Sequence, residues 1–118
     1  IFYGACVDPS TMDIALVLEH IPGQTLRAAI PRSAPTSLVE MVGRLRLADD
    51  VCCALTYLHT QKPVVIHGDI KDSNIIVEMR AGETKARLLD FGLSRLLTRG
   101  AENLGGSLRW AAPEVLSR

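Results

Sequence analysis

Apolar and polar residues alternate along the chain in short blocks that predict several strands. The run Ile14–Leu18 contains no polar residue, and a continuous apolar run of this length predicts a strand buried on both faces. Val64–Ile66 and Arg87–Leu89 predict two further strands, and the second is expected to pair with Ile75–Val77 across a turn at Ala81–Glu83.

A long helix is predicted to begin at Ser37, because Ser37 and Glu40 have the spacing of a capping box. Four apolar residues then recur at helical intervals and form the face expected to point at the core: Leu47, Val51, Ala54 and Leu58. Gly43 weakens the first turns, which leaves it as an alternative start of the helix. Lys62–Pro63 is expected to end the helix, and Thr25–Ile30 predicts a second, shorter one.

Two segments lack regular periodicity. Pro22 and Gly23 break regular structure after the first apolar run, which predicts a connector whose backbone N–H and C=O groups can bond something other than a neighbouring strand. Residues 93–111 are rich in Gly, Ser, Thr and Arg, which predicts an exposed, mobile loop and a place for regulation, with hydroxyls at Ser94, Thr98 and Ser107.

The chemistry-bearing residues fall in three motifs that follow one another along the chain: His67-Gly68-Asp69-Ile70-Lys71-Asp72-Ser73-Asn74, Asp90-Phe91-Gly92 and Ala112-Pro113-Glu114. Asp69 and Asn74 follow one predicted strand and Asp90 ends another, so their side-chain oxygens are expected to converge. Magnesium prefers oxygen ligands and binds one or two carboxylates plus substrate phosphates. Asn74 and Asp90 suit that ion, which leaves Asp69 for an attacking hydroxyl. The order of motifs therefore predicts phosphoryl transfer.

On these motifs the chain, from Leu16 to Leu116, resembles the eukaryotic protein kinase family, and the segment 106–114 resembles its tyrosine-kinase-like serine/threonine members. The resemblance implies an α+β fold that is part of the two-lobed kinase domain. Residues 1–18 would form the end of the small lobe and residues 19–23 the hinge. Residues 24–118 would form the first part of the helical large lobe, through the activation segment.

The resemblance also implies the catalytic roles. Asp69 would orient the substrate hydroxyl, and Lys71, two residues later, would neutralise the transferring phosphate, which marks serine/threonine specificity. Asn74 and Asp90 would hold Mg²⁺. Ser107 would bond Asp69 and Lys71. ATP and Mg²⁺ are therefore the implied cofactors, and a serine or threonine hydroxyl of a protein is the implied acceptor.

The same resemblance places adenine at the hinge. The Glu19 carbonyl and the Ile21 amide would bond the purine edge, with Leu18 beside it as gatekeeper. Ile76 would form an apolar floor below the ring. These four residues are the implied nucleotide-binding set.

Gly68 departs from the family pattern, because most members carry Arg before the catalytic Asp. Pairing of that guanidinium with a phosphorylated activation loop is then lost, and an active state independent of loop phosphorylation is expected. His67 is expected to pack on Phe91 and to bond a backbone carbonyl. His-Gly-Asp is also the form of this loop in small-molecule phosphotransferases of the aminoglycoside type, but Lys71 and Ala112–Glu114 favour the protein kinase.

A non-catalytic pseudokinase acting as a binding module is the other alternative, but it would be expected to lose Asp69, Asn74 or Asp90, and all three are present. The chain shows no Gly-rich phosphate loop and no strand lysine with a partner glutamate. We therefore expect a fragment of a longer kinase, inactive in phosphoryl transfer by itself.

Composition adds further limits. The 118 residues include 13 basic and 13 acidic side chains, so the neutral chain has no electrostatic footprint for nucleic acid. No apolar run approaches the roughly 18 residues of a membrane span. Three cysteines, Cys6, Cys52 and Cys53, indicate neither a disulfide framework nor a zinc site. A cytoplasmic location, or the cytosolic side of a membrane receptor, is expected.

Overall fold

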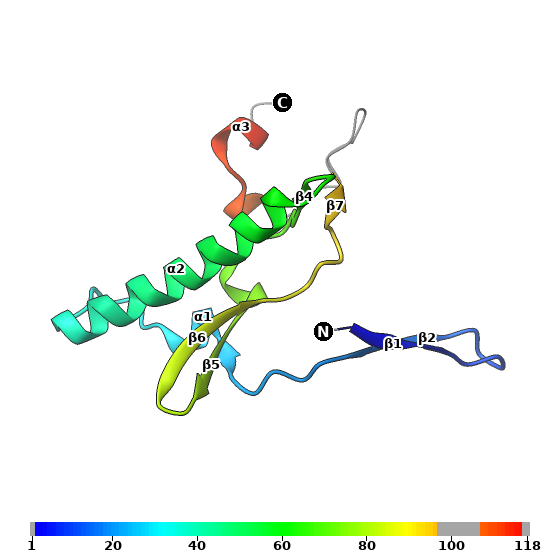
Figure 1. The fold of residues 1–118 in the computed structure, drawn as a ribbon, viewed down its shortest axis with the longest axis horizontal. Helices are drawn as coiled ribbons and strands as arrows, with labels where there is room; N and C mark the ends of the chain where they lie inside the picture. Colours follow the sequence, from blue (N-terminus) through cyan, green and yellow to red (C-terminus); the bar gives the residue numbers. More distant parts are fainter. Residues whose placement is uncertain (1, 97–106, 117–118) are drawn as a thin grey trace.

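The computed structural model describes residues 2–96 and 107–116 as a mixed helix and sheet, or α+β, arrangement (Figure 1). Its elements follow in the order β1 (Phe2–Val7), β2 (Ile14–Leu18), β3 (Gln24–Thr25), α1 (Leu26–Ala29), α2 (Leu38–Thr60), β4 (Val65–Ile66), η1 (Asp72–Asn74), β5 (Ile75–Arg80), β6 (Glu83–Leu88), β7 (Arg95–Leu96), η2 (Leu108–Trp110) and α3 (Pro113–Leu116). The predicted strands and both predicted helices are confirmed, with small shifts of their ends.

The small core lies where α2 crosses the sheet β3-β5-β6. Strands β5 and β6 pair as expected; the pairing is antiparallel, with Ile75 opposite Leu88, and Gln24 of β3 pairs with Val77 on the other edge of β5. Ile75, Val77 and Leu47 of α2 are the buried apolar residues of the described chain. The long helix and this sheet therefore set the position of the loop that precedes β5 and of the segment that follows β6.

Helix α2 begins as predicted. The Ser37 hydroxyl accepts a hydrogen bond from the Glu40 amide at 3.2 Å, while the Glu40 carboxylate accepts one from the Thr36 amide at 3.0 Å. The alternative start at Gly43 is wrong, because the helix runs through that residue. A glycine inside a helix costs roughly 1 kcal/mol, and the 2.6 Å Glu40–Arg44 ion pair spans Gly43 and helps to offset that cost.

The hairpin β1–β2 departs from expectation. Strand β2 forms and pairs with β1, with Val7 opposite Ile14, but it is exposed along its whole length. The prediction that Ile14–Leu18 is buried on both faces is wrong. In Figure 1 the hairpin stands apart from α2 and the central sheet, and a strand is buried only where other layers cover its faces.

The segment predicted as a mobile loop contains regular structure within its described residues. Strand β7 pairs antiparallel with β4, with Ile66 opposite Arg95, and η2 forms a short turn of helix. The expectation of an irregular segment is therefore wrong at these places, while Thr98 lies outside the described residues. Within the described part of the chain, no helix has the length and apolar character to cross a membrane.

Candidate active site

His67 anchors the loop between β4 and β5. Its ring is 1% exposed, and its Nε2 lies 2.9 Å from the Leu89 carbonyl oxygen. Because Nδ1 accepts a hydrogen bond from the Asp69 amide, Nε2 carries the proton and donates to Leu89. The ring also packs on Phe91, with centroids 4.9 Å apart. Both contacts expected for His67 are confirmed, and they tie this loop to the residues around Asp90.

Gly68 allows the two segments to approach closely. Its φ is +86°, and a Cβ at this position would lie 2.5 Å from the Leu93 carbonyl oxygen. The hydroxyl of Ser94 donates to the His67 carbonyl at 3.0 Å, so this half-buried side chain, expected to be regulatory, is engaged in the fold. The glycine therefore has a local steric reason in addition to any effect on loop phosphorylation.

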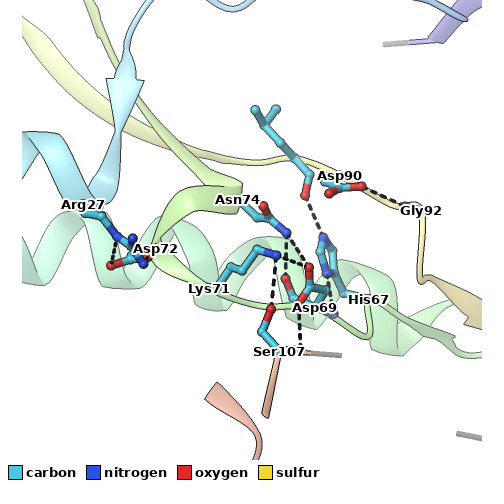
Figure 2. Close-up of polar contacts among 10 residues, drawn as sticks. Arg27, His67, Asp69, Lys71, Asp72, Asn74, Asp90, Gly92 and Ser107 are labelled. Atoms are coloured by element: carbon cyan, nitrogen blue, oxygen red, sulfur yellow. Dashed lines mark hydrogen bonds and ion pairs between the residues drawn. The ribbon is translucent and has the colours of Figure 1, made fainter. Parts of the chain in front are cut away.

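Two side chains and one backbone amide converge on the Asp69 carboxylate (Figure 2). Lys71 Nζ lies 2.6 Å from Asp69 Oδ2, and Asn74 Nδ2 donates to the same oxygen at 3.0 Å. Asn74 also donates to the Asp69 backbone carbonyl at 3.0 Å. From the far end of the chain, the Ser107 amide donates to Asp69 Oδ1 at 3.1 Å, and Lys71 Nζ donates to the Ser107 hydroxyl at 3.2 Å. The structure thus contains the contacts expected of Ser107.

These hydrogen bonds stabilise the charged form of Asp69. The Lys71 ammonium, followed by the Ser107 hydroxyl, lowers the pKa of Asp69 from 3.8 to about 2, against the opposing effect of burial. Asp69 is therefore a carboxylate at neutral pH. A group with such a low pKa is a weak base, so it is suited to orienting a hydroxyl by accepting its hydrogen bond rather than to removing the proton early.

Asn74 and Asp90 are the two residues predicted to hold a metal ion. The described side-chain hydrogen bonds of Asn74 all use Nδ2, which leaves the amide oxygen for a cation. Asp90 has a φ of +62° and is exposed, and its Oδ1 accepts from the Gly92 amide at 3.2 Å. In Figure 2 this bond joins Asp90 to Gly92 and not to the group around Asp69.

The described residues contain no cluster of three or more His, Cys, Asp or Glu side chains that could hold a metal. One amide and one carboxylate nevertheless fit Mg²⁺, since this ion takes the rest of its oxygen ligands from water and phosphates. The donor types of Asn74 and Asp90 are thus ones that suit Mg²⁺.

The four residues expected around adenine do not all line one cavity. Glu19 and Ile21 line a hollow of about 420 Å³ together with Leu88. Leu18 and Ile76 line neither this hollow nor the larger one between α1, α2 and β5. Leu18 is exposed on the separate hairpin, whereas Ile76 lies in the middle strand of the central sheet. The structure therefore does not bring Leu18 and Ile76 into one cavity with the other two residues.

Sequence reasoning missed one contact of the loop between β4 and β5, residues 67–74, which we call the catalytic loop. Arg27 of α1 donates through Nε and Nη2 to both carboxylate oxygens of Asp72, at 3.0 and 2.8 Å. The two residues are 45 positions apart, and no motif or periodicity links them. Only the packing of α1 against η1 makes this pair visible.

Comparison with known proteins agrees with the class that this site defines. The family model described as "Protein kinase domain" matches residues 2–118, so the chain belongs to the protein kinase family. Serine/threonine-protein kinase CTR1 of Arabidopsis thaliana is 31% identical over 98% of the chain and 14% of its own length. Probable serine/threonine-protein kinase drkD of Dictyostelium discoideum is 32% identical over 99% of the chain and 9% of its own length.

Serine/threonine/tyrosine-protein kinase HT1 of Arabidopsis thaliana is 36% identical over 98% of the chain and 28% of its own length. The chain therefore spans between 9% and 28% of the length of the curated relatives named here. The predicted family and fold class are confirmed. The individual roles of the site residues stay predictions.

Proposed function

We propose that the full-length natural chain carrying residues 1–118 is a serine/threonine protein kinase that transfers the γ-phosphoryl group of ATP to protein hydroxyls. The observation that supports this most directly is the convergence of Lys71, Asn74 and Ser107 on the Asp69 carboxylate. The printed names of CTR1 and drkD give the same hydroxyl specificity for those two relatives.

In this proposal each polar side chain has a separate task. The acceptor hydroxyl donates a hydrogen bond to Asp69, which aims its oxygen at the γ-phosphorus. A new P–O bond forms there while the bond to the β-phosphate oxygen breaks and ADP leaves. Lys71, 2.6 Å from Asp69, places an ammonium where it offsets charge on the transferring group. The hydroxyl proton passes to the Asp69 carboxylate only late in the transfer, because the low pKa of Asp69 makes early removal unfavourable.

Asn74 and Asp90 would hold the Mg²⁺ that accompanies ATP, and this ion would neutralise the phosphate oxygens when bound. The chain's own contribution is to orient these ligands. Asn74 is fixed by its two bonds to Asp69, and the segment around Asp90 is fixed by His67, which bonds Leu89. These bonds fix the loop at residues 67–74 relative to the segment that carries Asp90.

Nucleotide binding at the connector is the second part of the proposal. The Glu19 carbonyl and Ile21 amide would bond the purine edge, with Leu18 and Ile76 contacting the ring. This assignment divides the chain into the end of a small lobe at 1–18, a hinge at 19–23 and part of a large lobe at 24–118. The position of Glu19 and Ile21 along one hollow supports it for those two residues.

The test compares two substitutions in the full-length natural chain. Asp69→Asn should lower kcat by about 10²- to 10⁴-fold with nucleotide affinity kept, because it removes the orienting carboxylate. Asp90→Asn should also weaken magnesium-dependent nucleotide binding. Asp49→Asn, on the exposed side of α2, is the matched control and should leave both quantities unchanged.

The assay follows phosphate incorporation into serine, threonine and tyrosine of a protein substrate, with nucleotide affinity measured by calorimetry. Equal, mild effects of the Asp69 and Asp90 changes would contradict the roles given to them. Transfer to an aminoglycoside but not to protein would favour a small-molecule phosphotransferase. Nucleotide binding with no transfer in the unsubstituted protein would favour a pseudokinase.

A further inference from the structure

The ion pair between Arg27 and Asp72 is the one bidentate link from outside the catalytic loop to the middle of that loop among the described residues (Figure 2). Two parallel N–H···O bonds fix the plane of a carboxylate as well as its distance. Asp72 is the first residue of η1 and directly follows Lys71. A change in the direction of Asp72 therefore acts on the backbone that carries Lys71.

Arg27 is itself held in a defined place. It lies in α1, whose N-terminus is capped by the Thr25 hydroxyl, which accepts from the Ala28 amide. Thr25 also ends β3, where it pairs with Ile76 of the central sheet. The guanidinium thus projects from an element attached to the sheet and connected, through β3, to the connector at residues 19–23.

The loop around Asp72 is fixed at its two ends by other contacts. At the start, His67 bonds Leu89. At the end, the Leu89 amide donates to the Asn74 carbonyl at 2.8 Å, and the Asn74 amide donates to the Lys71 carbonyl at 3.0 Å. Between these ends, Asp69 and Lys71 contact Ser107, and within η1 itself Asp72 makes the long-range side-chain contact, so Asp72 is placed to set the tilt of η1 relative to Asp69.

The pair is poorly placed to contribute much to folding. The Arg27 side chain is 53% exposed, and exposed ion pairs contribute little to the free energy of unfolding. Such a pair can instead fix the orientation of the Asp72 side chain. Because Asn74 and Lys71 both bond Asp69 at 3.0 Å or less, a small tilt of η1 changes two contacts of the proposed orienting carboxylate at once.

We propose that Arg27 is a positioning residue for phosphoryl transfer: it holds Asp72, and through η1 it keeps Lys71 and Asn74 on Asp69. The inference rests on the function proposed above. Loss of the pair should misorient the acceptor hydroxyl more than it disturbs the nucleotide, since a misplacement of reacting groups by about 1 Å can cost up to roughly 10²-fold in rate.

The experiment uses the full-length natural chain with Arg27→Gln, Asp72→Asn, the double variant and Arg27→Lys. We expect each neutral single variant to lower kcat by about 5- to 20-fold while the KM for ATP and the thermal midpoint change little. The double variant should be no slower than the slower single variant, because both changes remove the same contact. Arg27→Lys should recover only part of kcat, because an ammonium keeps the charge but lacks the planar fork.

Arg46→Gln, on the exposed side of α2, is the matched control and should keep full kcat. Unchanged kcat in both single variants, or losses that multiply in the double variant, would overturn the proposal. A fall in kcat that tracks a fall in thermal midpoint would also overturn it, since the pair would then act through folding. If Asp69→Asn retained full turnover, the proposed function itself would fail; if it abolished turnover while Arg27→Gln did not alter it, only the role of Arg27 would fail.

Discussion

The two antiparallel hairpins, β1–β2 and β5–β6, are built by the same local rules but differ in what surrounds them. Both pair antiparallel, β1–β2 with a register shift between Phe2 and Gly4 and β5–β6 without one, and both turns contain a residue with positive φ, Met12 in the first and Ala81 in the second. In β5, Ile75 is 5% exposed, whereas Ile14 of β2 is 68% exposed. The difference comes from α2, which packs along β6 and whose Asp50 accepts a hydrogen bond from the Ala86 amide.

This comparison shows that an apolar strand pattern predicts pairing but not burial. Pairing needs only two segments and a turn, which are neighbours in the chain. Burial needs a second layer, and α2 supplies that layer to β5–β6 from a distant part of the sequence. The catalytic loop ends at the start of β5, so its geometry depends on the covered hairpin.

The largest expected effect is on the covered hairpin. Ile75→Ala should lower the free energy of unfolding by about 2–4 kcal/mol, because it removes a buried side chain and leaves a cavity beside the catalytic loop. Urea unfolding of residues 1–118 would measure this loss. Met79→Ala, on the exposed side of β5, is the matched control and should change the free energy of unfolding by less than about 0.5 kcal/mol. Equal losses in the two variants would show that β5 is not covered on one face.

A second expectation compares two carboxylates held in different ways. The pKa of Asp8 is lowered by hydrogen bonds from Ser10 within its own turn, and the pKa of Asp69 is lowered to about 2, first by Lys71 and then by Ser107 from a distant segment. Lys71→Met should therefore raise the pKa of Asp69 toward 3.8 and leave that of Asp8 unchanged. Carboxyl ¹³C shifts recorded between pH 2 and 6 would show it.

The sign of the pH effect follows from the depressed pKa. The contribution of the Asp69 network to stability is fully present above about pH 4 and is lost as the pH falls through about 2, where the folded carboxylate takes up a proton. No loss from Asp69 is expected between pH 5 and 8. An Asp69 pKa near 3.8 in the unsubstituted chain would contradict the contacts of Lys71 and Ser107.

The smallest expected effect is on the exposed hairpin. Ile14→Ala should change the free energy of unfolding of residues 1–118 by less than about 0.5 kcal/mol, because the side chain is already in contact with solvent. The same urea experiment measures it. A loss of several kcal/mol would break the comparison. Repeating the substitution in the full-length natural chain would then sharpen it, since a large effect only there would mean that residues outside 1–118 cover β2.

Local patterns in the sequence determined a large part of this fold. The capping box at Ser37 predicted the start of α2, with Gly43 left as an alternative, and the apolar runs predicted that the segments at 75–77 and 87–89 pair. His67 and its contacts with Phe91 and the Leu89 carbonyl followed from resemblance to the family. The helix start and the strand pairing depend on residues that lie close in the chain, whereas the His67 contacts join two motifs and could be predicted only through the family resemblance.

Tertiary structure alone decided which strands are covered and which distant side chains meet. It left β2 exposed, brought Arg27 to Asp72 across 45 positions, and engaged the Ser94 hydroxyl with the His67 carbonyl. It also showed that a Cβ at Gly68 would clash with the Leu93 carbonyl as this structure has it. Such contacts depend on how α1, α2 and the sheet pack together, and packing over long sequence separations leaves no periodicity or spacing that a single sequence can reveal.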